Sequence, residues 1–79
     1  IAYLMYTIYT QKYCGYCFKA KELMKEHNCE FMEISLDHDD QARVLLKEQG
    51  LKTVPQIYDE GNNHIGGYTD LLKTFKKVG

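Results

Sequence analysis

The sequence has few cysteines, and their number is odd: three in 79 residues. A small secreted domain held together by disulfides would normally carry an even number of them, and usually more. Two of the three stand close together and the third stands alone. This pattern argues against a disulfide-stapled scaffold and favours an intracellular protein whose cysteine pair takes part in chemistry, so we expect a cytoplasmic location.

The sequence also lacks an excess of charge of either sign. It has 10 basic and 11 acidic residues, a net charge of −1, and the charges are interspersed. A nucleic-acid or anionic membrane surface would need a strongly basic face, so we expect neither partner. The longest apolar stretch, residues 1–8, is far shorter than the ~20 residues of a membrane span.

Linkers, internal repeats and low-complexity runs are missing as well. The chain is near the lower end of the usual domain size, and its hydrophobic content of 44% is enough for one small core. We therefore expect a single domain over residues 1–79, acting as a monomer.

The first half of the chain changes from an apolar strand pattern to a helical one and back. Residues 3–9 are apolar at almost every position, which predicts a central strand, and Thr10–Lys12 reads as a polar loop. From Tyr16 the apolar residues recur at helical spacing until Asn28, and residues 31–35 alternate as a second strand. Such a unit predicts two parallel strands with a right-handed crossover.

The second half adds two helices and a hairpin. The expected elements are a helix at 42–49 ended by Gly50, strands at 56–59 and 64–66 joined by a turn at 60–63, and a helix from Thr69. Two lists give the residues expected to face inward: Ala42, Leu45, Leu46 and Gln49, then Leu71, Leu72, Phe75 and Val78. The order βαβ-α-ββα predicts an α/β fold, a four-stranded mixed sheet with three helices distributed over both faces.

Cys14 and Cys17 lie where the first strand has ended and the first helix begins. The unpaired N–H groups and the dipole of a helix start favour an anion, so Cys14 is the expected thiolate, and Lys12 adds positive potential. Cys17 lies one turn inside on the apolar stripe and should stay protonated. Gly15 should let the backbone turn tightly between them. An attacking and a resolving thiol need this asymmetry.

The same pair also allows a structural role or half of a zinc site. Zinc needs four ligands, usually supplied by a second pair. The remaining candidates are Cys29, His27, His38 and His64, and they form no recognisable second half. We predict no metal site and expect Cys29 to be a buried small hydrophobic residue. From the residues alone both alternatives to redox chemistry stay open.

Three separated stretches resemble the glutaredoxins, which have the thioredoxin-like fold. They are Tyr13-Cys14-Gly15-Tyr16-Cys17, similar to C-P-Y-C; Thr53-Val54-Pro55-Gln56-Ile57, similar to T-V-P-x-[IF]; and His64-Ile65-Gly66-Gly67-Tyr68-Thr69-Asp70, similar to [HK]-I-G-G-[YF]-x-[DE]. Their order and spacing agree over nearly the whole chain. Thioredoxins proper usually carry W-C-G-P-C and lack the third stretch.

The resemblance implies a glutathione-dependent oxidoreductase that reduces protein disulfides and glutathione mixed disulfides. It gives Cys14 the nucleophile position and Cys17 the resolving position. Glutathione is then a co-substrate, with no tightly bound cofactor. The implied protein partners carry disulfides or glutathione adducts, and ribonucleotide reductase is one candidate.

The resemblance also implies a glutathione site. Its expected residues are Lys12, Tyr16, Thr53, Val54, Pro55, Gly67, Thr69 and Asp70. The backbone of Val54 would pair with the tripeptide, and Pro55 would follow a cis peptide bond. The first turn of the last helix, at Thr69 and Asp70, would receive the γ-glutamyl group.

Two departures from the family pattern keep other functions open. Gln11 stands where many members have the Lys or Arg that meets the glycine carboxylate, so Lys12, with Lys52, is expected to substitute. Gly15 stands where proline is usual in the family. Members that lack this proline include those that bind a glutathione-ligated iron–sulfur cluster. One alternative is such a cluster-binding protein. The other is a glutaredoxin-like electron donor that is reduced by thioredoxin reductase and serves ribonucleotide reductase.

Overall fold

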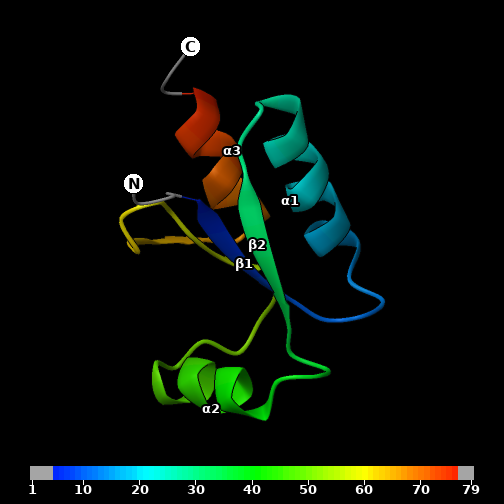
Figure 1. The fold of residues 1–79 in the computed structure, drawn as a ribbon, viewed down its shortest axis with the longest axis vertical. Helices are drawn as coiled ribbons and strands as arrows, with labels where there is room; N and C mark the ends of the chain where they lie inside the picture. The colour runs from blue at the N-terminus through cyan, green and yellow to red at the C-terminus, as the bar shows by residue number, and fades with distance from the viewer. Residues whose placement is uncertain (1–4, 77–79) are drawn as a thin grey trace.

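The computed structural model describes residues 5–76, which form one four-stranded sheet and three helices (Figure 1). In chain order the elements are β1 (Tyr6–Thr10), α1 (Gly15–Glu26), β2 (Phe31–Ser35), α2 (Asp40–Glu48), β3 (Gln56–Tyr58), β4 (His64–Gly66) and α3 (Tyr68–Lys76). The strand order is β2-β1-β3-β4. β1 pairs with β2 in parallel and with β3 antiparallel, and β3 pairs antiparallel with β4. The predicted mixed sheet and element order are confirmed.

The central position predicted for the first strand is confirmed, but the strand runs further than predicted. β1 has a neighbour on each side, and Ile8 on it is fully buried. Thr10 belongs to β1 and not to the following loop, because it pairs with Ser35 in the ladder. Its hydroxyl is buried and donates to Glu33 Oε2 at 2.8 Å, so a polar residue completes this strand. Residue 3, predicted to begin the strand, lies outside the described residues.

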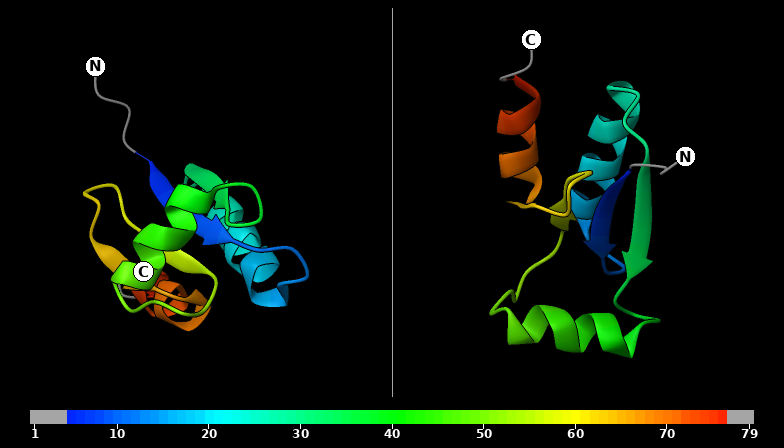
Figure 2. Two further views of the ribbon diagram at one scale, coloured as in Figure 1. Left: turned by 90° about the horizontal axis from the view of Figure 1, so that it is seen from below. Right: turned by 60° about the vertical axis from the view of Figure 1, so that its left-hand side comes forward.

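Two apolar clusters lie against the sheet. α1 and α3 lie side by side over one face (Figures 1 and 2). The buried residues of the first cluster are Ile8, Ala20, Leu23, Met24, Ile57 and Leu71. Leu36, Ala42 and Leu46 form the second cluster, and Tyr9 packs against it. Because consecutive strand residues point to opposite faces, Ile8 and Tyr9 reach opposite sides of the sheet.

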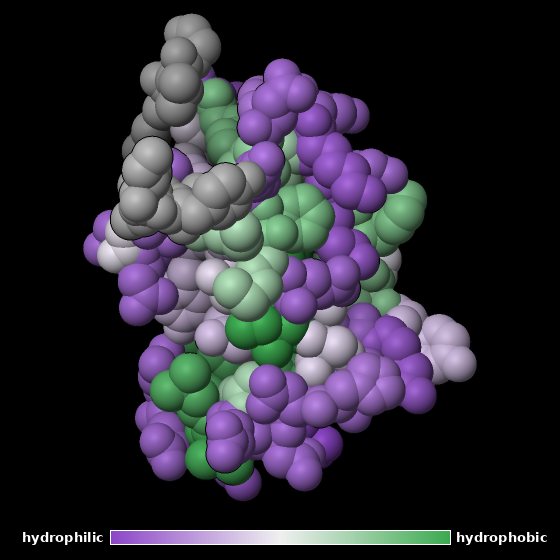
Figure 3. Space-filling model, viewed as in Figure 1, coloured by the Kyte–Doolittle hydropathy of each residue, from purple (hydrophilic) through white to green (hydrophobic). Residues whose placement is uncertain are grey.

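α2 is the element whose packing differs most from its sequence pattern. It lies beyond the carboxyl ends of β1 and β2, so only Ala42 and Leu46 on it are buried. Leu45, predicted to face inward, is 43% exposed, and Gln49 is exposed, although its amide oxygen accepts from the Tyr58 hydroxyl at 2.7 Å. Figure 3 shows apolar side chains gathered over this helix.

The helix ends follow the predicted turn residues closely. α1 is followed by Asn28 at φ 54° and α2 by Gly50 at φ 75°, the left-handed conformations that asparagine and glycine tolerate. α3 begins at Tyr68, one residue before the predicted start. Its inward residues Leu71, Leu72 and Phe75 are buried or half-buried as predicted, and residue 78 lies outside the described residues. No helix within residues 5–76 is both long enough and apolar enough to cross a bilayer.

Candidate active site

The two cysteines stand at the start of α1, as the sequence predicts. Cys14 is the N-cap residue, with φ −106° and ψ 104°, and Cys17 lies in the first turn. The tight turn before them is made at Tyr13, which has φ 62° and a fully exposed side chain. The prediction that Gly15 makes this turn is wrong, because Gly15 is already the first helical residue and has no left-handed φ.

The surroundings of the two thiols differ in the way that an attacking and a resolving thiol require. Cys14 is half-buried, and its sulfur accepts the backbone N–H of Cys17 at 3.1 Å, a contact that favours a thiolate. Cys17 is only 3% exposed. Burial, together with its hydrogen bond to Cys14, raises the pKa of Cys17 to about 12. Cys14 is therefore the more accessible of the two thiols, and the raised pKa of Cys17 favours its protonated form.

A groove of about 160 Å³ opens on one flank of Cys14. It is lined by Tyr16, Thr53, Val54, Pro55, Gly67, Tyr68, Thr69 and Asp70. The groove reaches the cysteine through Val54, whose carbonyl oxygen lies 3.8 Å from Cys14 Sγ. The Val54–Pro55 peptide bond is cis, which confirms that prediction. Segments from three separate parts of the chain thus meet beside Cys14 Sγ.

The far wall of the groove is the N-terminus of α3. The Leu71 N–H donates to the Gly67 carbonyl at 3.0 Å, so the N–H groups of residues 68–70 precede the first helical hydrogen bond. Asp70 Oδ2 accepts from the Gly67 N–H at 3.1 Å and caps the helix from its own first turn. Free N–H groups at a helix start can bind a carboxylate, and the Asp70 carboxylate can bind an ammonium group.

Gly66 is required by the conformation of this wall. Its φ is +122°, and an added Cβ would collide with the Asp70 side chain. We expect Gly66→Ala to lower the free energy of unfolding by about 1–3 kcal/mol, because alanine strongly disfavours this backbone conformation. Urea denaturation would measure the change. The control is Gly15→Ala, whose Cβ would meet nothing within 4 Å and whose helical position should make it neutral or stabilising. Equal stability of the two variants would contradict this account of Gly66.

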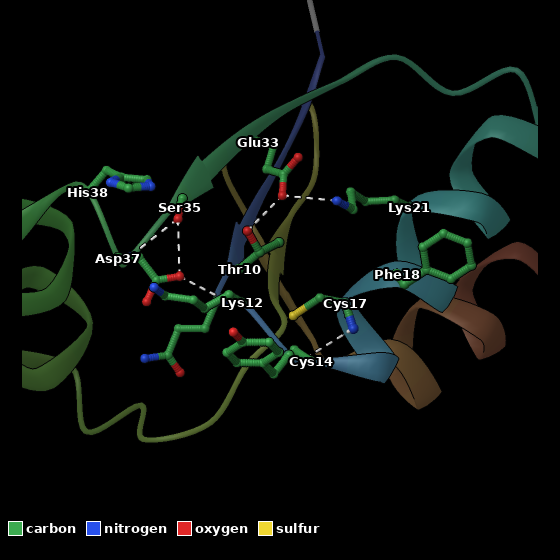
Figure 4. Close-up of a pocket in the computed structure, with 12 residues that line it drawn as sticks. Thr10, Lys12, Cys14, Cys17, Phe18, Lys21, Glu33, Ser35, Asp37 and His38 are labelled. Atoms are coloured by element: carbon green, nitrogen blue, oxygen red, sulfur yellow. Dashed lines mark hydrogen bonds and ion pairs between the residues drawn. The ribbon is translucent and has the colours of Figure 1, made fainter.

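A second, larger cavity of about 390 Å³ opens between α1, β1 and the end of β2 (Figure 4). Its lining residues are Thr10, Gln11, Lys12, Tyr13, Cys14, Cys17, Phe18, Lys21, Glu33, Ser35, Asp37 and His38. It shares no lining residue with the groove. Both cysteines line this cavity. Cys14 therefore has the groove on one side, through Val54, and this cavity on the other.

Seven of the eight residues predicted for glutathione line the groove together. Lys12 is the exception, because it lines the second cavity and its backbone N–H donates to Asp37 Oδ2 at 2.7 Å. Sequence reasoning gave Tyr68 no role, yet it lines the groove with its ring centroid 6.0 Å from that of Tyr16. The sequence signal that could have identified Tyr68 as a groove residue is its position directly after Gly66 and Gly67, at the start of a helix.

Cys29, His27 and His64 line neither hollow, and His38 lines only the second cavity. Cys29 is half-buried at the edge of the first cluster, and burial raises the pKa of its thiol. His27 is exposed and stacks on Phe75 at a centroid distance of 4.4 Å. Within residues 5–76, no three His, Cys, Asp or Glu side chains gather in a way that could hold a metal ion.

Known proteins resemble this chain in both sequence and fold. A sequence model of the glutaredoxins matches residues 6–65. A glutaredoxin of Pseudomonas aeruginosa is 42% identical over 65 residues, covering 81% of this chain and 76% of that protein. Glutaredoxin 3 of Escherichia coli is 40% identical over 65 residues, with 81% and 77% covered.

Solved structures of glutaredoxins also share the fold of this chain. Glutaredoxin 1 from Francisella tularensis, crystallised with cacodylate, superposes with a TM-score of 0.80 at 32% identity, over 96% of each chain. A buckwheat glutaredoxin in complex with glutathione superposes with a TM-score of 0.80 at 26% identity, over 95% of this chain and 71% of that one.

Proposed function

Since this chain belongs to the glutaredoxin family and is a glutathione-dependent thiol–disulfide oxidoreductase, we propose that Cys14 is its nucleophile and Cys17 its resolving thiol. The observation that carries this assignment is the contrast in burial. Cys14 is half-buried beside the groove and accepts an N–H group, whereas Cys17 is buried and protonated. Only Cys14 is placed to meet a substrate sulfur.

In the dithiol route the thiolate of Cys14 attacks a protein disulfide, and one substrate sulfur leaves. Cys17 then attacks Cys14, which forms the Cys14–Cys17 bond and releases the second substrate sulfur. One glutathione reopens this bond, and a second glutathione clears the resulting mixed disulfide as oxidised glutathione.

In the monothiol route Cys14 alone takes the glutathione moiety from a glutathionylated protein. A second glutathione then attacks the mixed disulfide and regenerates the Cys14 thiolate. Cys17 takes no part in this route, so the two routes make different demands on the pair.

We propose that the groove holds the glutathione moiety while its sulfur is bonded to Cys14. The Val54 backbone would add the tripeptide like a strand, because Val54 precedes β3 and lies outside its ladder. The N–H groups of Thr69 and Asp70 would bind the γ-glutamyl carboxylate, and the Asp70 side chain the ammonium group. Thr53, Pro55, Gly67 and Tyr16 form the walls.

Lys12 remains a predicted contact for the glycine carboxylate. It is exposed and only two residues from Cys14, although it lines the other cavity. As protein partners we propose disulfide-bearing and glutathionylated proteins, ribonucleotide reductase among them, met by a cytoplasmic monomer.

A stable mixed disulfide would test the groove directly. In the Cys17→Ser variant, Cys14 can be trapped with glutathione or, as a matched control, with 2-mercaptoethanol, which forms the same bond without the tripeptide. We expect backbone amide shifts at Val54, Thr69 and Asp70 in the NMR spectrum of the glutathione adduct only. Shifts confined to the second cavity would overturn the proposed groove.

The charge of Asp70 should contribute to substrate binding. Asp70→Asn keeps an oxygen for the Gly67 N–H and removes only the charge that would pair with the γ-glutamyl ammonium group. We expect KM for a glutathionylated peptide to rise by about five- to tenfold, with a smaller effect on kcat, as for an exposed charge-assisted contact. The matched control is Asp40→Asn on the exposed face of α2. A fall in kcat at unchanged KM would contradict this role.

A further inference from the structure

One wall of the second cavity carries a hydrogen-bonded cluster that the proposed function does not use. Lys21 of α1, Thr10 of β1 and Glu33 of β2 meet there (Figure 4). Glu33 Oε2 accepts from the Thr10 hydroxyl at 2.8 Å and from Lys21 Nζ at 3.0 Å. The Lys21 and Glu33 side chains are 27% and 38% exposed, so this ion pair lies at the surface of the cavity that the two cysteines also line.

Cys17 and Lys21 lie four residues apart on α1, a spacing that places both side chains on one face of the helix. Both line the same cavity. We propose that Lys21 is a positioning residue for the resolving step: its ammonium group, held by Glu33, stabilises the Cys17 thiolate as it forms.

The buried position of Cys17 is what makes such help necessary. Cys17 must lose its proton before it can attack, but burial raises its pKa far above neutral pH. Two groups act in the opposite direction and favour the thiolate, the backbone N–H of Gln11 and the charge of Lys21. Lys21 is thus the charged side chain that favours a Cys17 thiolate.

The other charged groups of the cavity are less suited to this role. They are Lys12, Glu33, Asp37 and His38, together with Cys14 itself. Glu33 is a poor base, because the hydrogen bond from Thr10, with a smaller contribution from Lys21, lowers its pKa against the effect of burial. Asp37 already accepts the Lys12 backbone N–H, and His38 is exposed at the rim.

The step itself needs no further reactant. The bond between Cys14 Sγ and the substrate sulfur breaks as the Cys14–Cys17 bond forms, and the electron pair leaves on the substrate sulfur. The proton lost by Cys17 is returned through solvent to that sulfur. In the reverse direction Cys17 is the leaving thiolate, so Lys21 should assist closing and opening equally.

The proposal rests on the resolving role of Cys17 and is tested by single-turnover kinetics. Reduced protein is mixed with oxidised glutathione and quenched with acid, and mass spectrometry separates the Cys14–glutathione adduct from the Cys14–Cys17 disulfide. We expect Lys21→Met to slow the conversion of adduct to disulfide by about three- to tenfold. Loss of this charge lowers the thiolate fraction of Cys17, and the higher nucleophilicity of the remaining thiolate recovers only part of the rate.

Three variants separate this effect from a structural one. Lys21→Arg keeps the charge and the reach to Glu33, so it should restore most of the rate. Lys25→Met removes an equal charge one helical turn beyond Lys21, where the side chain is exposed and does not line the cavity, and should leave the rate unchanged. Glu33→Gln keeps an oxygen for both donors but removes the opposing charge, so closing should be as fast as wild type or faster.

The outcomes that overturn the proposal are distinct from those that overturn the function. If the wild-type adduct never closes, the resolving role of Cys17 fails. If the wild type closes and Lys21→Met closes at the same rate, only the role of Lys21 fails. If Glu33→Gln slows closing as much as Lys21→Met, Glu33 is the base and the assignment to Lys21 is wrong.

Discussion

Cys14→Ser is expected to abolish both disulfide reduction and deglutathionylation, leaving only the uncatalysed rate. A serine hydroxyl keeps its proton at neutral pH and cannot attack a disulfide as a thiolate does. The structure offers no substitute, because Cys17 is buried and Cys29 packs at the edge of the first cluster. An NADPH-coupled assay with glutathione and glutathione reductase measures both activities.

Cys29→Ser makes the same chemical change away from the groove and serves as the control. It should keep the activity, since Cys29 lines neither hollow beside the cysteine pair. Circular dichroism of both variants checks the fold. Measurable turnover by Cys14→Ser would show that another thiol is the nucleophile and would refute the assignment.

Cys17→Ser is expected to separate the two routes. Reduction of protein disulfides should be lost, because the covalent intermediate on Cys14 can no longer be released by ring closure. Deglutathionylation should continue at a rate close to the wild type, since glutathione from solution clears the Cys14 adduct. The N–H of residue 17 still reaches Cys14 Sγ, because that hydrogen bond comes from the backbone.

Parallel assays on a disulfide-bonded protein and on a glutathionylated peptide measure this separation. Loss of both activities in a folded Cys17→Ser protein would mean that the division of roles between the cysteines is wrong. Retention of both would mean that glutathione, and not Cys17, resolves protein adducts as well.

The fold could be predicted because local signals and the global pattern agree. Asn28 and Gly50 end helices in the conformations that their residue types tolerate, and Asn62 at φ 65° lies in the predicted hairpin turn. The apolar run of β1 predicted its central place in the sheet. In each case a short stretch of sequence carries enough information to predict a turn, a helix end or a strand's place in the sheet.

The errors arise where tertiary packing decides. Leu45 follows the helical pattern of α2, but this helix lies across the strand ends and buries too narrow a stripe to cover it. Thr10 looks like a loop residue, yet Glu33 on the neighbouring strand supplies the partner that lets its hydroxyl be buried. Neither the placement of α2 nor the Glu33 partner of Thr10 can be identified from the local sequence pattern.

The candidate site divides in the same way. The residues of the groove lie in three recognisable stretches, so the family resemblance could assign them one by one. The cluster of Lys21 and Glu33 was not predicted, because an ion pair between α1 and β2 leaves no signature in either segment. Tyr68 was missed because an aromatic residue at a helix start is equally consistent with packing.

The most direct test of the account compares two reductants for one substrate. A glutathionylated peptide is offered to the protein with NADPH and either glutathione plus glutathione reductase or thioredoxin reductase alone. The groove beside Cys14 predicts rapid turnover in the first mixture and, at most, slow turnover in the second. Turnover with thioredoxin reductase alone, unaffected by added glutathione, would contradict the claim that this pair of cysteines works through glutathione.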